Sequence, residues 1–151
     1  MRQRASHRED RSERLADTLH SAAIHLLRRL RKEDAITGLS PARLSALSVI
    51  VFGGPLRISQ LARAEQVRTP TITPIVAALE EAGLIARRPD AKDGRAAILT
   101  ATSKGQKLMA AGRARRVAAL AAQLRALSPR DRALLEKAAP LLQKIARERM
   151  L

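Results

Sequence analysis

The chain has no cysteine, tryptophan or tyrosine, and Phe52 is its only aromatic residue. The absence of cysteine excludes disulfides, thiolate zinc sites and cysteine-based redox sensing. With a single aromatic side chain, the protein also lacks the stacking platforms on which most single-stranded nucleic-acid binders depend. Since hydrophobic residues still make up 46% of the 151 residues, we expect one folded chain with an aliphatic core.

Long apolar runs and recognisable catalytic patterns are missing as well. No stretch approaches the roughly 18 apolar residues of a membrane span, and residues 1–14 lack the apolar segment of a signal peptide. We find no phosphate-binding loop, dinucleotide fingerprint or nucleophile–base spacing. His20 and His25 do not share a helix face, so a metal site is not expected. These absences favour a cytoplasmic, nucleoid-associated protein without a membrane span, enzymatic activity, metal or cofactor.

Positive charge is abundant. Lysine and arginine number 29 against 14 acidic residues, which gives a formal net charge of +15. Such an excess favours a polyanionic partner, because binding releases condensed counterions. Nucleic acid is the first candidate, and an anionic membrane surface is the other.

The first part of the chain predicts a tail followed by a long helix. Residues 1–12 mix arginine, serine and acids without periodicity, which is typical of a flexible basic tail. Apolar residues then recur at three- and four-residue steps over 13–34, which predicts an amphipathic helix. We expect residues 13–38, ending at Gly38, to form an N-terminal dimerisation helix.

The central part, residues 39–102, predicts three helices and a β-hairpin. Ser40-Pro41 and Thr69-Pro70 are both typical helix starts. A third, short helix is expected between the two helices that begin there. After Gly83 the periodicity changes, and two short strand candidates flank a turn-rich segment at 89–94. This order is that of a winged helix-turn-helix, which presents its second motif helix to the major groove and its hairpin to a minor groove.

The last part, residues 103–151, predicts two C-terminal dimerisation helices. Thr102 is the expected cap of the first, Ser128-Pro129 begins the second, and Pro140 should kink or break it. A small winged domain covers only part of the apolar faces near both termini, so a two-fold homodimer should bury the rest. The predicted fold class is mainly α with a small β-hairpin wing (α+β), flanked by N- and C-terminal dimerisation helices.

The segment ISQLARAEQVRTPTITPIVAALEEAGLIARRPDAKDGRAAILTAT resembles the core of the MarR family of winged-helix regulators. The matching pieces are QLA in the short helix, TPTIT…LEEAGLI in the recognition helix and DGRAAILT across the wing. The resemblance implies a dimeric transcriptional regulator that binds double-stranded DNA. It also implies that Asp93 and Arg95 hold the wing, with the arginine entering the minor groove.

The residues of the wing and of the recognition helix also indicate, apart from the resemblance, how each element would contact DNA. An arginine at a hairpin tip presents a rigid, permanently charged guanidinium to a narrow, electronegative minor groove. On the recognition helix, Pro74 stands where the family often has a base-reading arginine, and it leaves the Pro70 carbonyl without its helical donor. We therefore expect an irregular first turn, and major-groove reading by threonine hydroxyls and by apolar contact with thymine methyl groups. The wing and DNA shape would then carry more of the specificity.

The candidate site has three groups of residues. The predicted DNA-binding residues are Arg68, Thr69, Pro70, Thr71, Thr73, Pro74, Arg87, Arg88, Lys92, Asp93 and Arg95, with Arg57 and Arg63 as further phosphate contacts. A small anionic or phenolic effector, of the kind that family members often bind, would lie near His25, Arg28 and Arg29.

The predicted function is a sequence-specific transcriptional regulator, expected to be a repressor that an effector releases, bound as a dimer to a pseudo-palindromic operator. A weakly specific or architectural DNA-binding protein is the alternative. Two further alternatives have less support. An RNA-associated basic protein would be expected to have aromatic side chains for base stacking, and an enzyme would need a catalytic constellation, which the sequence does not show.

Overall fold

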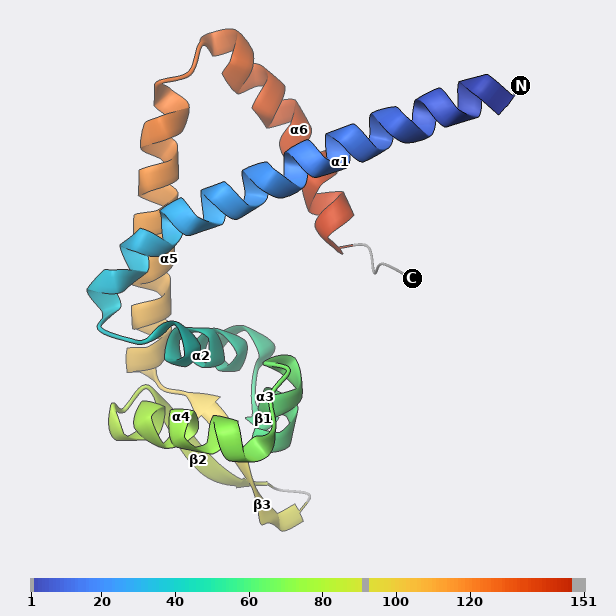
Figure 1. Ribbon diagram of the computed structural model, residues 1–151. Coiled ribbons are helices and arrows are strands. Elements are labelled where there is room, and N and C mark those ends of the chain that lie inside the picture. Colours follow the sequence, from blue (N-terminus) through green and yellow to red (C-terminus); the bar gives the residue numbers. More distant parts are fainter. Residues whose placement is uncertain (1, 91–92, 148–151) are drawn as a thin grey trace. The chain divides into compact units, whose positions relative to one another are not determined.

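The computed structural model describes residues 2–90 and 93–147, with side chains described for residues 10–90 and 97–146 (Figure 1). Helices dominate, and three short strands form one sheet. In chain order the elements are α1 (Arg2–Arg31), the 3₁₀ helix η1 (Lys32–Thr37), α2 (Pro41–Gly53), β1 (Leu56–Arg57), α3 (Ile58–Ala64), α4 (Thr69–Glu81), β2 (Ile85–Asp90), β3 (Asp93–Ala101), α5 (Ser103–Arg125) and α6 (Pro129–Arg147). The predicted fold class, a winged helix-turn-helix with flanking helices, is confirmed.

The chain divides into two compact units, Met1–Arg115 and Arg116–Leu151. The first unit holds the winged domain and the beginning of α5. Sequence reasoning placed the whole of α5 with the C-terminal helices, whereas Gly105 and Met109 of this helix are buried with the core of the first unit. The first turns of α5 therefore belong structurally to the winged domain.

One aliphatic core holds the winged domain together. It is built from the inward faces of α2, α3 and α4, the inner side of the sheet and the start of α5. Its buried members are Ala46, Leu47, Ile50, Leu56, Leu61, Ala62, Ile72, Val76, Leu79, Leu84, Ile85, Leu99 and Met109. The inward faces of α2, α3 and α4 are thus aliphatic, as expected of a chain with one aromatic residue.

Helix ends follow the expected signals in most places. The Ser40 side chain accepts from the backbone N–H of Arg43 and caps α2. Gly83, with φ of 68°, ends α4: its N–H donates to Glu80 and the next N–H, of Leu84, donates to Leu79. This pair of bonds is the Schellman arrangement, which favours glycine at that position.

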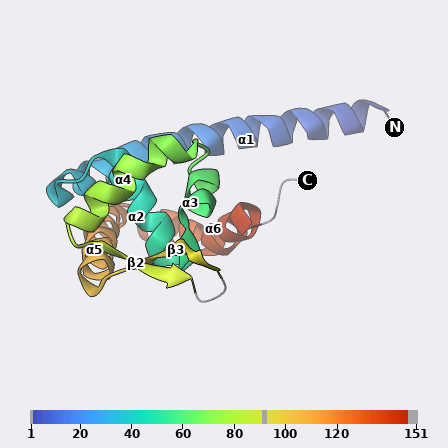
Figure 2. The ribbon, with the colours of Figure 1, turned by 90° about the horizontal axis from the view of Figure 1, so that it is seen from below.

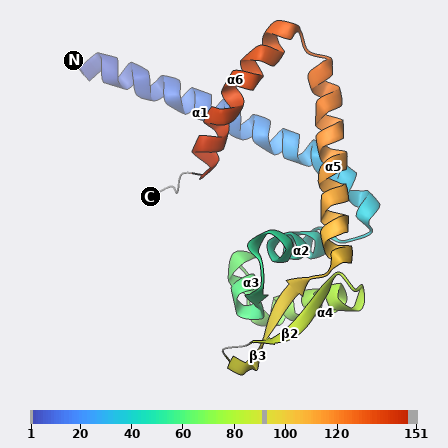
Figure 3. The same cartoon turned by 180° about the vertical axis from the view of Figure 1, so that it is seen from behind.

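The sheet has the order β1-β3-β2, and both pairings are antiparallel. The β2–β3 hairpin is the predicted wing, and Figure 3 shows it extending away from the helices. Strand β1 was not predicted, because two residues between a glycine-proline turn and a helix leave no periodicity to detect. It pairs Leu56 with Leu99 and Arg57 with Ile98, and so adds a third strand at the base of the wing.

Two expectations about helices were wrong, and a third was wrong in part. Helix α1 begins at Arg2, where a loose tail was expected, since the arginines, alanine and glutamate there are good helix formers and the Arg14–Asp10 pair supports one face. Helix α4 has Arg68, and not Thr69, as its N-cap. Pro140 does not break α6, since only one backbone bond is lost on an exposed helix where water can replace it, and of the expected kink or break only a kink stays a prediction.

Helices α1 and α6 expose many large apolar side chains. On α6 these include Leu134, Leu141 and Ile145, which are 58%, 63% and 64% exposed. Among the described residues no single helix is long and apolar enough to cross a membrane, and the segments Asp10–Thr37 and Pro41–Gly53 reach that length only together, across a bend of 92°.

Candidate nucleic-acid interface

The helix-turn-helix is formed by α3, a short turn and α4. The turn is fixed by backbone bonds, in which the N–H of Val67 donates to Ala62 at 2.9 Å and that of Gln66 to Arg63 at 3.1 Å. Gln66 adopts φ of 56°, the left-handed region that side chains other than glycine rarely enter. The tight turn places α4 against both α2 and α3.

Helix α4 separates its side chains cleanly into two faces. Ile72, Val76 and Leu79 are almost completely buried, with at most 1% of each exposed. The residues on the other side are all exposed: Thr69, Pro70, Thr71, Thr73, Pro74 and Ala77. Seen from below, α4 and the wing both face the viewer, so the domain offers them on one side (Figure 2).

Thr71 and Thr73, both on the exposed face of α4, differ in the hydrogen bonds of their hydroxyl groups. The Thr73 hydroxyl donates to the Thr69 carbonyl at 2.8 Å, so it has only lone pairs left for a ligand. The Thr71 hydroxyl makes no hydrogen bond within the described part of the chain. Thr71 is therefore the hydroxyl that keeps both its donor and its acceptors for base edges.

The N-terminal end of α4 is electropositive and free of acidic groups. The first turn has no aspartate or glutamate, and the exposed Arg68 precedes it. Helix dipoles favour anions at such an end. Helix α4 continues through Pro74, and the Pro70 carbonyl that loses its donor lies in an exposed turn. The expected irregularity of the first turn stays a prediction.

The described part of the wing carries two of the predicted arginines. Arg87 of β2 is bound by Glu80 of α4, with 2.8 Å between Nε and Oε2, so it ties the wing to the recognition helix. Arg88, one residue on, is exposed. Arg63, at the end of α3, is exposed as well.

The tip of the wing carries the remaining predicted residues. Lys92 lies outside the described residues. Asp93 and Arg95 lie on β3, but their side chains are outside the described ones. Their predicted roles stay predictions.

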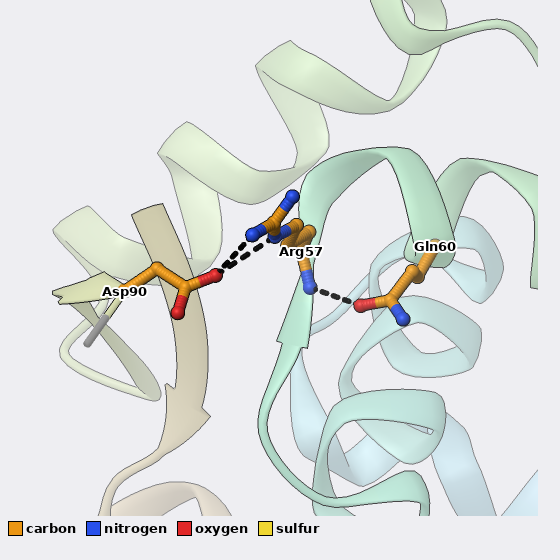
Figure 4. A network of polar contacts seen from close by, with 3 residues as sticks. All are labelled: Arg57, Gln60 and Asp90. Atoms are coloured by element: carbon orange, nitrogen blue, oxygen red, sulfur yellow. Dashed lines mark hydrogen bonds and ion pairs between the residues drawn. The ribbon is translucent and has the colours of Figure 1, made fainter. Parts of the chain in front are cut away.

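Arg57, predicted as a phosphate contact, is held by protein groups. Its Nε donates to Asp90 Oδ2 at 2.9 Å, and its Nη2 donates to the same oxygen (Figure 4). Its backbone N–H donates to Gln60 Oε1 at 2.7 Å. Sequence reasoning missed this network, since Arg57 and Asp90 are 33 residues apart and neither belongs to a recognisable spacing.

A second unpredicted cluster joins the end of α4 to the start of α5. The Thr102 hydroxyl donates to the Gly83 carbonyl at 2.7 Å and accepts from the N–H of Gly105 at 3.1 Å. Lys104 Nζ donates to the Ala82 carbonyl at 2.7 Å. The expected capping role of Thr102 is thus confirmed, and the same hydroxyl also fixes the recognition helix to α5.

The proposed effector residues His25, Arg28 and Arg29 are all exposed on α1. Within the described residues, no group of three or more histidine, aspartate or glutamate side chains is placed to hold a metal ion.

Comparison with known proteins identifies the family of the chain. Residues 39–97 match the MarR family. An uncharacterised HTH-type transcriptional regulator of Mycobacterium leprae is 34% identical over 107 residues, which cover 71% of this chain and 75% of the relative. The crystal structure of a putative transcriptional regulator from Pseudomonas aeruginosa is 31% identical with a TM-score of 0.77, and the match covers 92% of this chain and 98% of that one.

Two further structures with this fold contain ligands. Staphylococcus aureus MepR, bound to an oligodeoxyribonucleotide, is 19% identical with a TM-score of 0.67, covering 87% of this chain and 95% of that one. NadR in complex with 4-hydroxyphenylacetate is 25% identical with a TM-score of 0.60, covering 87% and 91%. By the sequence match and the shared winged-helix architecture together, this chain belongs to the MarR family of DNA-binding transcriptional regulators.

Proposed function

We propose that this regulator binds a pseudo-palindromic operator as a homodimer and represses transcription by occupying it. The observation that carries the proposal is the exposed face of α4, which combines threonines and prolines with an electropositive N-terminus. Such a face suits the floor of a major groove, where threonine hydroxyls can hydrogen-bond base edges and apolar side chains can contact thymine methyl groups. Arg63, Arg68 and Arg88 surround it and suit phosphate contacts.

Within the recognition helix, Thr71 is the proposed reader of a base edge. Its hydroxyl is exposed and keeps its donor, whereas that of Thr73 is engaged by the Thr69 carbonyl. Pro70 and Pro74 offer only apolar surface and suit thymine methyl groups. This face has no guanidinium or amide side chain for a bidentate contact with a base, so the reading by α4 should be weak for each base pair.

The wing supplies the second part of the proposed recognition. Arg95, with Asp93 beside it on β3, would enter the minor groove, where narrow A·T-rich tracts concentrate negative potential. Lys92 would add a phosphate contact. Together these residues make the wing the main anchor, and DNA shape a major source of specificity.

Dimer formation is supported by the exposed apolar faces of α1 and α6. An isolated soluble chain rarely exposes so many leucines on a single helix stripe, and contact with a second copy would remove them from water. A two-fold dimer would set two recognition helices about one turn of DNA apart.

A small anionic or phenolic effector is the second component of the proposal. It is supported by the NadR complex with 4-hydroxyphenylacetate and by the exposed cations Arg28 and Arg29 near His25. Titrating 4-hydroxyphenylacetate into the protein–DNA complex tests it: release of DNA by wild type, but not by an Arg28→Ala/Arg29→Ala variant, is the expected result. Retention of DNA at saturating ligand would remove this ligand class.

Separate Thr71→Ala and Arg95→Ala variants test the proposed division of roles. Binding is measured on the duplex that wild type selects from a random library and on a scrambled duplex. We expect Arg95→Ala to reduce both affinity and discrimination, and Thr71→Ala to reduce discrimination by a smaller factor. A loss of specificity in the threonine variant alone would contradict the proposal.

The weakly specific alternative makes a different footprint. A repressor protects one palindromic site, whereas an architectural protein covers DNA uniformly at the same protein concentration and salt. Genome-wide footprinting at physiological salt therefore separates the two.

A further inference from the structure

Arg57 and Asp90 form an ion pair that spans the central strand of the wing sheet. The order β1-β3-β2 puts the two residues on the outer strands, which are not paired with each other. Two guanidinium nitrogens of Arg57 donate to one carboxylate oxygen of Asp90 (Figure 4). The side chains therefore connect two strands that the backbone leaves unconnected.

The ion pair also reaches Asp90, the last residue of β2, near the tip of the hairpin. Strand β1 is paired with β3 only at Leu56 and Arg57, opposite Leu99 and Ile98. Strands β2 and β3 continue past this point until Asp90. Within the described residues the outer wing thus has no third strand. The contact from Arg57 to Asp90 links the base of the sheet to the residue that ends β2.

At its other end, Arg57 is fixed to the helix-turn-helix. It is the N-cap of α3, and its N–H donates to Gln60 of that helix. The Asp90 side chain is only 12% exposed and that of Arg57 40%, so the pair is less screened than an ordinary surface pair. A guanidinium fork with two bonds to one carboxylate also restricts orientation more than a single bond would.

We propose that Arg57 is a positioning residue for DNA recognition: through Asp90 it holds the outer wing in a set orientation relative to α3 and α4. The inference rests on the proposed function, in which wing and recognition helix engage adjacent grooves. A wing that is already held in place before binding loses little orientational freedom when DNA binds. Because the entropy cost of binding is smaller, the affinity for DNA is higher.

The simpler role for Arg57, a direct phosphate contact, has the opposite consequence. In that role Asp90 competes with phosphate for the guanidinium and adds negative charge close to DNA. Removing the Asp90 charge would then strengthen binding. The sign of the change in affinity on losing Asp90 therefore distinguishes positioning from direct contact.

The test compares Asp90→Asn with wild type on the duplex that wild type selects from a random library. We expect Kd to rise about tenfold, which corresponds to about 1.4 kcal/mol, with an unchanged dependence of log Kd on log salt, because no phosphate contact is lost. The control is Asp17→Asn, the same substitution at an exposed site of α1, which should bind as wild type or slightly more tightly. Equal or tighter binding by Asp90→Asn would overturn the inference.

A charge exchange guards against a general loss of folding. Arg57→Asp alone should weaken binding, and Arg57→Asp combined with Asp90→Arg should recover most of the loss, since the opposite charges face each other again. Thermal melts accompany each variant. A double variant that folds but binds no better than Arg57→Asp alone would overturn the inference.

A measurement without DNA separates this inference from the proposed function. Because the chain has no cysteine, spin labels can be placed at Ser59→Cys on α3 and Ala97→Cys on β3, both exposed positions. The distance distribution should be narrow in the otherwise unchanged protein and broader with Asp90→Asn. Equal widths would overturn the positioning role. Failure of wild type to bind any duplex, with widths that still differ, would overturn the proposed function and leave Arg57 as a residue that orients the wing for another purpose.

Discussion

At the scale of single residues, Gly105 is the position where one added methyl group should matter most. A Cβ built there would lie 2.2 Å from the Leu84 carbonyl oxygen and 3.1 Å from its carbon, so the backbone would have to move. We expect Gly105→Ala to lower the free energy of unfolding by about 3 kcal/mol, which corresponds to a Tm roughly 10 °C lower. Thermal and urea denaturation measure this.

Gly53→Ala is the matched control for that prediction. Its nearest neighbour would be Val49 Cγ1 at 4.0 Å, an ordinary contact, and the residue ends α2. The added methyl group should leave stability unchanged or raise it by up to about 1 kcal/mol. Equal effects at Gly53 and Gly105 would show that the close approach of α5 to Leu84 is not a constraint.

Gln66 is the second residue at which backbone conformation should decide how a substitution changes stability. Its φ of 56° in the turn before α4 suits glycine. Gln66→Gly should raise the free energy of unfolding by about 0.5–1 kcal/mol, and Gln66→Val should lower it. Denaturant midpoints of the two variants check the order, and a lower midpoint for the glycine variant would contradict the strain assigned to this turn.

At the scale of elements, the joint between α4 and α5 rests on Thr102. Its hydroxyl caps α5 and also binds the Gly83 carbonyl at the end of the recognition helix. Thr102→Ala should lower the free energy of unfolding by about 1–2 kcal/mol, while Thr102→Ser should keep nearly all of it. Hydrogen exchange at the end of α4 should rise in the alanine variant only. Equal exchange in both variants would mean that the joint does not hold the helix.

The elements that could be predicted from sequence are those whose signals are local. The Ser40 cap, the Gly83 ending and the buried stripe of α4 each follow from residues a few positions apart. Strand β1 and the Arg57–Asp90 pair could not be predicted, because they depend on which distant segments the fold brings together.

Two kinds of local signal, prolines inside helices and single arginines, could not be interpreted without the fold. Neither Pro74 nor Pro140 interrupts its helix, since both lie at exposed positions where water can replace the lost backbone bond. Sequence indicated the recognition helix and the wing as the candidate site, but it predicted Arg57 as a phosphate contact, whereas the fold pairs this side chain with Asp90.

At the scale of the whole molecule, the exposed stripe of α6 is expected to be a dimer contact. Leu141 is 63% exposed on it. Leu141→Glu should therefore yield a monomer in sedimentation velocity, with DNA binding weakened by about 10²-fold or more through loss of bivalency, while the core of the winged domain melts unchanged. Gln143→Glu introduces the same charge on the opposite, also exposed, side of α6 and should remain dimeric. A dimeric Leu141→Glu protein would exclude this stripe from the interface.

We propose that two copies of the winged domain read DNA together, with α4 in the major groove and the wing beside it. Selection of bound duplexes from a random library by the purified protein at physiological salt tests it most directly. The expected result is one enriched motif of two inverted half-sites, whose centres lie about one helical turn (about 10 base pairs) apart. Recovery of sequences without any enriched motif, or of a single half-site without a partner, would contradict it.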